Sequence, residues 1–140
     1  RARLLMRRAF IKSAAAAVAV NAVLWVVAAV IGLVPALGES TFFGGVLFAS
    51  FGATAAAAIV ASRFTAAGAR KRWAGISLAI LLLSFVSPLA LGAGNLPISP
   101  FNPADTTYNE FRGGFGIAYS ILHVTTYLAV QRFIGRVIPE

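Results

Sequence analysis

The chain has 140 residues, of which 59% are apolar and only 11% are charged, against roughly 25% charged in a typical soluble domain. Its 12 basic and four acidic residues give a formal net charge of +8, and the basic residues form short islands between long apolar runs. This distribution argues against a water-soluble protein and predicts an integral membrane protein. The absence of cysteine excludes disulfides, thiolate nucleophiles and cysteine-based zinc sites.

Four apolar segments are long enough to cross a hydrocarbon core of ~30 Å, which takes about 20 helical residues. They are expected at 14–34, 42–62, 73–91 and 114–134, with a long outer loop at 92–113. The first run exceeds the roughly 7 to 15 apolar residues of a signal peptide, so it is interpreted as a retained span. The predicted fold class is an all-α integral membrane protein, in which residues 1–140 form a single four-transmembrane-helix bundle.

The positions of lysine and arginine predict the orientation of these spans. Five lie in the N-terminal arm, four between the second and third spans, and two at the end of the fourth. Because short cytoplasmic loops are enriched in basic residues, both termini are expected on the cytoplasmic side of the cell membrane. The expected partner of these residues is the anionic lipid headgroup layer, and no nucleic-acid partner is predicted.

Small residues recur every four positions in the second span. They let the backbone of a neighbouring helix approach closely, as transmembrane helix interfaces require. The pattern predicts close packing within one bundle, with a dimer interface as the alternative. The residues of this stripe are Gly45, Ala49, Ala53, Ala57 and Ala61.

Proline interrupts the third span. Pro88 cannot donate a hydrogen bond to the carbonyl of Ser84, so a kink is expected in the outer half of this helix. The kink is interpreted as structurally satisfied, with a hinge or cavity lining as the functional alternative.

The fourth span carries a line of polar residues along one face, spaced four apart and centred on His123. Polar groups are costly in lipid, so they are expected to converge inside the bundle with polar residues of similar depth on the other helices. His123 is either a neutral ring that fixes helix register or a ligand contact or proton relay. The predicted ligand-binding or polar-core residues are His123, Tyr119, Tyr127, Gln131, Asn21 and Ser84.

The few titratable residues favour a non-enzymatic accessory or scaffold component of a membrane assembly, alone, as a homo-oligomer or beside a larger membrane protein. One alternative is a small carrier or channel with a polar cavity around His123, although no span contains the Asp or Glu of proton-coupled exporters. A second alternative is a lipid- or cofactor-binding intramembrane protein. Enzymatic hydrolysis by a Ser84–His123 dyad lacks a Gly-x-Ser-x-Gly motif, and two-histidine haem ligation would require a second copy.

No cofactor and no metal site are predicted. In the outer loop, Asp105 and Glu110 are five residues apart, which matches no recognised calcium spacing. The loop is therefore interpreted as a lid or contact surface.

Three short stretches carry a resemblance to a known family. They read AVNAVLW in the first span, WAGISLAILLLSFVSPLAL in the third and ILHVTTYLAV in the fourth. The chain thereby resembles an uncharacterised family of small four-span membrane proteins common in actinobacteria. The resemblance implies four spans and no assigned activity, and the long polar outer loop departs from the family pattern. The matching positions are Asn21, Trp73, Ser84, Pro88 and His123.

Overall fold

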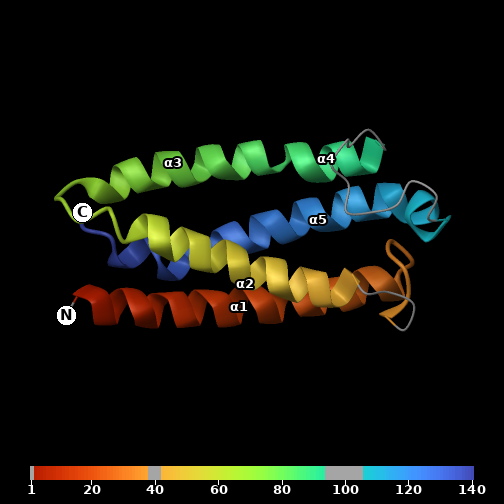
Figure 1. Ribbon diagram of the computed structural model, residues 1–140, viewed down its shortest axis with the longest axis horizontal. Coiled ribbons are helices and arrows are strands. Elements are labelled where there is room, and N and C mark those ends of the chain that lie inside the picture. The colour runs from red at the N-terminus through yellow and green to blue at the C-terminus, as the bar shows by residue number, and fades with distance from the viewer. Residues whose placement is uncertain (1, 38–41, 94–105) are drawn as a thin grey trace.

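The computed structural model describes residues 2–37, 42–93 and 106–140, and every regular element in these ranges is a helix (Figure 1). Within them, four helical stretches are long and apolar enough to cross a membrane, which confirms the predicted all-helical fold. They are Ala2–Val30, Phe43–Ala61, Ala69–Ala93 and Asn109–Val137. The elements are α1 (Ala2–Val30), α2 (Phe42–Ala61), α3 (Ala69–Ser84), α4 (Val86–Ala93), α5 (Thr106–Phe133) and the short 3₁₀-helix η2 (Gly135–Val137).

The helices lie side by side in an elongated bundle, with both marked chain ends at the same end of it (Figure 1). The beginning of α1, the turn between α2 and α3, and η2 meet there. Together with the first turn of α3 and the last turn of α5, which adjoin them, these segments carry every lysine and arginine of the described residues except Arg112. We call this the basic end. The charge islands of the sequence are thus one region of the folded chain.

The first helix differs at both ends from the predicted span 14–34. It begins at Ala2, so the basic N-terminal arm is a continuation of the helix. It ends at Val30, because Gly32 adopts a left-handed backbone with φ of 76°. The N–H of Leu33 donates to the carbonyl of Ala28 at 2.9 Å, which completes a Schellman C-cap.

The predicted outer loop 92–113 is wrong at both of its edges. Helix α4 extends to Ala93, and α5 begins at Thr106, so Glu110 and Arg112 are helical. Gly113, at the predicted end of the loop, thus lies within α5. The expectation of a lid or contact surface otherwise concerns residues 94–105, which lie outside the described residues.

The third span is divided into two helices at Phe85. The N–H of Phe85 donates to the carbonyl of Leu82 at 3.3 Å, a tighter connection than the α-helical one. Pro88, one turn later, has no N–H to offer the carbonyl of Ser84. The interruption therefore lies where the sequence predicts a kink.

Two apolar clusters hold the ends of the bundle. At the basic end, Ala9, Trp73 and Ile138 belong to one cluster, and at the opposite end Trp25 and Phe115 belong to another. Both clusters take residues from α1 and α5, because the buried residues of these helices recur at intervals of three or four. On α1 this buried stripe is Ala9, Ser13, Ala17, Asn21, Trp25 and Ala28.

Two glycines let α5 approach its neighbours closely at the end opposite the basic end. A Cβ added at Gly116 would lie 3.0 Å from the Cα of Gly92 and 3.0 Å from the carbonyl oxygen of Pro88. A Cβ at Gly114 would lie 1.5 Å from the carbonyl oxygen of Leu33. The positions of α4 and of the turn after α1 therefore both depend on glycine in α5.

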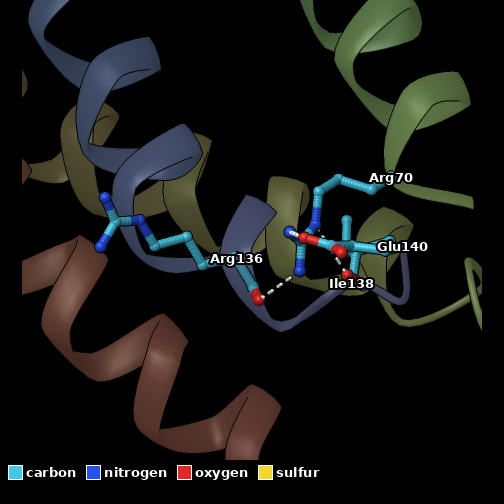
Figure 2. Close-up of polar contacts among 4 residues, drawn as sticks. All are labelled: Arg70, Arg136, Ile138 and Glu140. Carbon is cyan, nitrogen blue, oxygen red and sulfur yellow. Dashed lines mark hydrogen bonds and ion pairs between the residues drawn. The ribbon is translucent and has the colours of Figure 1, made fainter.

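At the basic end, Arg70 fixes the last residues of the chain to the beginning of α3 (Figure 2). Its guanidinium donates to the carbonyls of Ile138 at 3.0 Å and Arg136 at 2.9 Å, and pairs with the carboxylate of Glu140. The backbone N–H groups of Gly68 and Arg70 also donate to carbonyls of this segment. The sequence predicts only that Arg70 contacts lipid headgroups, whereas in the structure it bonds to the last residues of the chain.

Candidate functional site

A buried polar cluster joins α1, α2 and α5 midway along the bundle. The amide nitrogen of Asn21 donates to Ser50 Oγ at 2.7 Å and to Thr126 Oγ1 at 2.9 Å, while its carbonyl oxygen accepts from the Thr125 hydroxyl. Ser50 in turn donates to the carbonyl of Val46 at 2.7 Å. The Asn21 side chain therefore has hydrogen-bond partners for both of its N–H groups and for its oxygen, as burial requires.

Beside this cluster, a cavity of about 370 Å³ lies between α2, α3 and α5. Its walls are mostly alanine, valine, leucine and isoleucine side chains from α2 and α3. Half of its polar lining residues come from α5, and the others are Asn21, Ser50, Ser77 and Ser84. We call this cavity the groove, because exposed residues such as Ala53 and Ile80 form its edges.

His123 lines the groove midway along α5 and is half-buried. Its Nδ1 lies 2.6 Å from the carbonyl oxygen of Tyr119 on the same helix. A carbonyl oxygen only accepts hydrogen bonds, so Nδ1 carries the proton in the neutral ring and Nε2 presents a lone pair. The ring also packs near Phe85, with 6.4 Å between the ring centroids, at the interruption between α3 and α4.

The groove brings together five of the six residues that the sequence singled out. Tyr119, Tyr127 and Ser84 line it together with His123 and Asn21. The Tyr119 ring is held by Trp25 at 5.3 Å, in the cluster opposite the basic end.

Gln131 does not line the groove. Its amide nitrogen donates to Ser77 Oγ at 2.6 Å, which links α5 to α3. Ser50 and Thr126, which hold Asn21, are recognisable in the sequence by polarity and depth. Nothing in the sequence places Thr125 opposite Asn21 on α1.

The small-residue stripe of α2 has a different role from the predicted close packing within the bundle. Ala61 is buried against the cluster at the basic end, but Ala49 and Ala53 are exposed and line the groove, and Gly45 is exposed as well. Helix α2 instead buries Val46, Ser50 and Thr54. The expectation of close packing within the bundle is therefore wrong for the middle of this stripe.

The hydroxyl of Ser84 is not joined to His123. Ser84 Oγ donates to the carbonyl of Leu81 at 2.7 Å, within its own helix. Among the described residues, no group of three or more His, Asp or Glu side chains is arranged to hold a metal ion. The groove therefore offers hydrogen-bonding groups on an apolar surface, an arrangement suited to binding.

Comparison with protein-family models, with curated proteins and with solved structures gives no match for this chain. The resemblance to the actinobacterial four-span family stays a prediction. The function has to be argued from the groove and the surfaces around it.

Proposed function

We propose that this protein is a multi-pass helical protein of the cell membrane, and that it binds a small, apolar, membrane-dissolved molecule in the groove. The groove itself carries the proposal. Its volume of about 370 Å³ lies within the ~300–1,000 Å³ of small-molecule sites, and it combines apolar walls with a few convergent polar groups. The proposed function is binding, and the Ser84 hydroxyl, which donates to its own helix, gives no support to a Ser84–His123 dyad.

The exposed surface of the bundle supports residence in a membrane. Large apolar side chains are exposed on all four spans, among them Val30 and Phe48, each 80% exposed, and Leu83 at 72%. A continuous apolar surface of this kind is rare on soluble monomers. A molecule dissolved in lipid would reach the groove between α2 and α3 without passing through water.

Photolabelling in nanodiscs tests the proposal. A panel of alkyl, sterol and isoprenoid probes, each with a diazirine, would be crosslinked to the purified protein and the labelled peptides identified by mass spectrometry. At least one probe is expected to label groove residues of α2, α3 or α5 saturably. The variant A53W, which fills the groove from its exposed edge, should abolish this labelling. The matched control A19W, on an exposed position of α1 away from the groove, should leave it unchanged.

Labelling that never saturates, or that A53W and A19W affect equally, would show that the probes report only the lipid-facing surface. The proposal would then fail.

For the orientation, we propose that the basic end faces the cytoplasm and contacts anionic headgroups, in accord with the clustering of basic residues there. Because the chain contains no cysteine, single-cysteine variants allow a direct measurement. A membrane-impermeant maleimide added to intact cells should label I31C, at the opposite end, and should leave A67C, in the α2–α3 turn, unlabelled. The reverse pattern would contradict this orientation.

A second candidate function is that of an accessory subunit, and the exposed glycines of α2 favour it. A Cβ added at Gly44, Gly45 or Gly52 would meet no atom within 4 Å, so this face is open to another helix. The most apolar stretch of α2 is 17% buried, as is that of the third span, against 33% for the first and fourth spans. Native mass spectrometry from nanodiscs should then detect a second copy or a larger membrane protein, and G45L should remove it. A strictly monomeric protein without a co-purifying partner would exclude this candidate.

A further inference from the structure

The free hydrogen-bonding capacity of the groove is concentrated on one face of α5. Within the described part of the chain, His123 Nε2 has no hydrogen-bond partner, since the ring bonds only through Nδ1. Thr126 Oγ1 accepts from Asn21, which leaves its own hydrogen unused, and the Tyr127 hydroxyl has no partner among the described residues either. Thr126 and Tyr127 lie three and four residues after His123, so they flank it on one side of the helix, and all three line the groove. Together they offer one acceptor and two donors.

The depth of these groups restricts what can bind them. His123 is 14 residues from each end of the candidate span Asn109–Val137 (123 − 109 and 137 − 123). At ~1.5 Å per residue it lies roughly 20 Å from either end, at the centre of the span. A charged group at that depth is costly, so the charged headgroup of a phospholipid is excluded as the bound polar group. The polar group of the ligand must be neutral.

The chemistry of the three groups restricts the ligand further. The lone pair on His123 Nε2 requires a donor, which a ketone, an ester, an ether or a hydrocarbon lacks. The hydroxyls of Thr126 and Tyr127 are free to donate, so the ligand should also carry an acceptor. A ligand whose polar group is only an N–H has no acceptor. A hydroxyl satisfies both requirements, because it donates one hydrogen bond and accepts others.

We therefore propose that the groove selects a neutral apolar molecule bearing a hydroxyl group, such as a long-chain or isoprenoid alcohol, a sterol or a quinol. Its O–H donates to His123 Nε2, its oxygen accepts from Thr126 or Tyr127, and its apolar body lies between α2 and α3. This inference rests on the proposed function. It adds the chemical class of the ligand and names His123 as the residue that selects it.

A matched pair of probes separates this inference from the proposed function. Hexadecan-1-ol and its methyl ether, each with a diazirine in the chain, have nearly the same apolar body and differ in the O–H donor. Saturable labelling of the groove would be measured in nanodiscs for both. The alcohol is expected to bind roughly tenfold more tightly than the ether, the upper range for one net hydrogen bond.

The variant H123F should bind both probes with the affinity of the ether, because phenylalanine keeps the ring beside Phe85 and removes the acceptor. The variant H123Q, whose amide oxygen can accept, should recover part of the preference. The control S62A, on an exposed residue directly after α2 and outside the groove, should behave as the unaltered protein does.

Equal saturable binding of alcohol and ether by the unaltered protein would overturn the hydroxyl selectivity and leave binding in the groove intact. Saturable binding of neither member of the pair, nor of the wider probe panel, would overturn both. The comparison of the two probes needs no variant, so it stands even if H123F does not fold.

Discussion

Replacing Asn21 by leucine tests whether the polar cluster holds the middle of the bundle together. The substitution keeps the side chain close to its original size and removes its contacts with Ser50, Thr125 and Thr126. Two of these partners retain acceptors within their own helices, since Ser50 donates to Val46 and Thr125 also lies 3.0 Å from the carbonyl of Leu122. The loss is therefore mainly that of the interhelical bonds.

The magnitude follows from the number of bonds that N21L removes. Interhelical hydrogen bonds in membrane proteins contribute ~0.6 kcal/mol each on average, so three bonds correspond to about 2 kcal/mol. The matched control is S120A, which removes a bond from Ser120 Oγ to the carbonyl of Gly116 within α5. This control should change the free energy of unfolding by less than ~0.5 kcal/mol.

The assay is reversible unfolding in mixed micelles with increasing mole fraction of SDS, followed by circular dichroism. N21L is expected to unfold at a lower SDS fraction than S120A. In a double-mutant cycle with S50A, the coupling energy should be near 0.6 kcal/mol. If N21L were as stable as S120A, or if the coupling with S50A were zero, the Asn21 cluster would not contribute to the stability of the bundle.

Two further predictions concern the ends of the bundle. G114A should destabilise the protein by ~1–3 kcal/mol in the same titration, because the new Cβ meets the carbonyl of Leu33. In the control G113A the new Cβ meets nothing within 4 Å, so this variant should be neutral or up to ~1 kcal/mol more stable. Equal effects of the two substitutions would refute the close approach of α5 to Leu33. R70M releases the carbonyls of Arg136 and Ile138 and so loosens the last residues of the chain. Because the Gly68 N–H donates to this segment, its hydrogen exchange should become roughly tenfold faster. E140Q should change this exchange less than twofold, since the 85% exposed carboxylate contributes little, and a larger effect of E140Q than of R70M would contradict the assigned role of Arg70.

The helices could be predicted from the sequence because their signals are local. Apolar length predicts the four spans, and Pro88 predicts the interruption beside Ser84, since proline removes a donor wherever its neighbours lie. The left-handed turn at Gly32 is local too, but it ends α1 before the apolar run ends. Hydrophobicity alone therefore places this helix end too late.

The arrangement of the helices depends on contacts between residues far apart in the sequence. Local sequence patterns do not predict which of these residues meet. The groove exists because α2 and α3 each pack against α5 without closing over it. Polarity and depth single out Asn21, but its pairing with Thr125 depends on the rotation of α1 and α5 about their axes. The small residues of α2 show the same limit of the sequence. They recur every four positions, as on a packed helix face, yet Gly45, Ala49 and Ala53 are exposed.

The buried polar cluster around Asn21 lies between the two apolar clusters, and each apolar cluster contains one of the two tryptophans of the chain. Trp25 stacks on Phe115 in one cluster, and Trp73 meets Phe64 edge to face in the other. The protein thus carries a separate natural fluorophore for each half of the bundle. Fluorescence of W25F and W73F would reveal in which order the two halves come apart, and Trp73, which lines the groove, would also respond to its occupant.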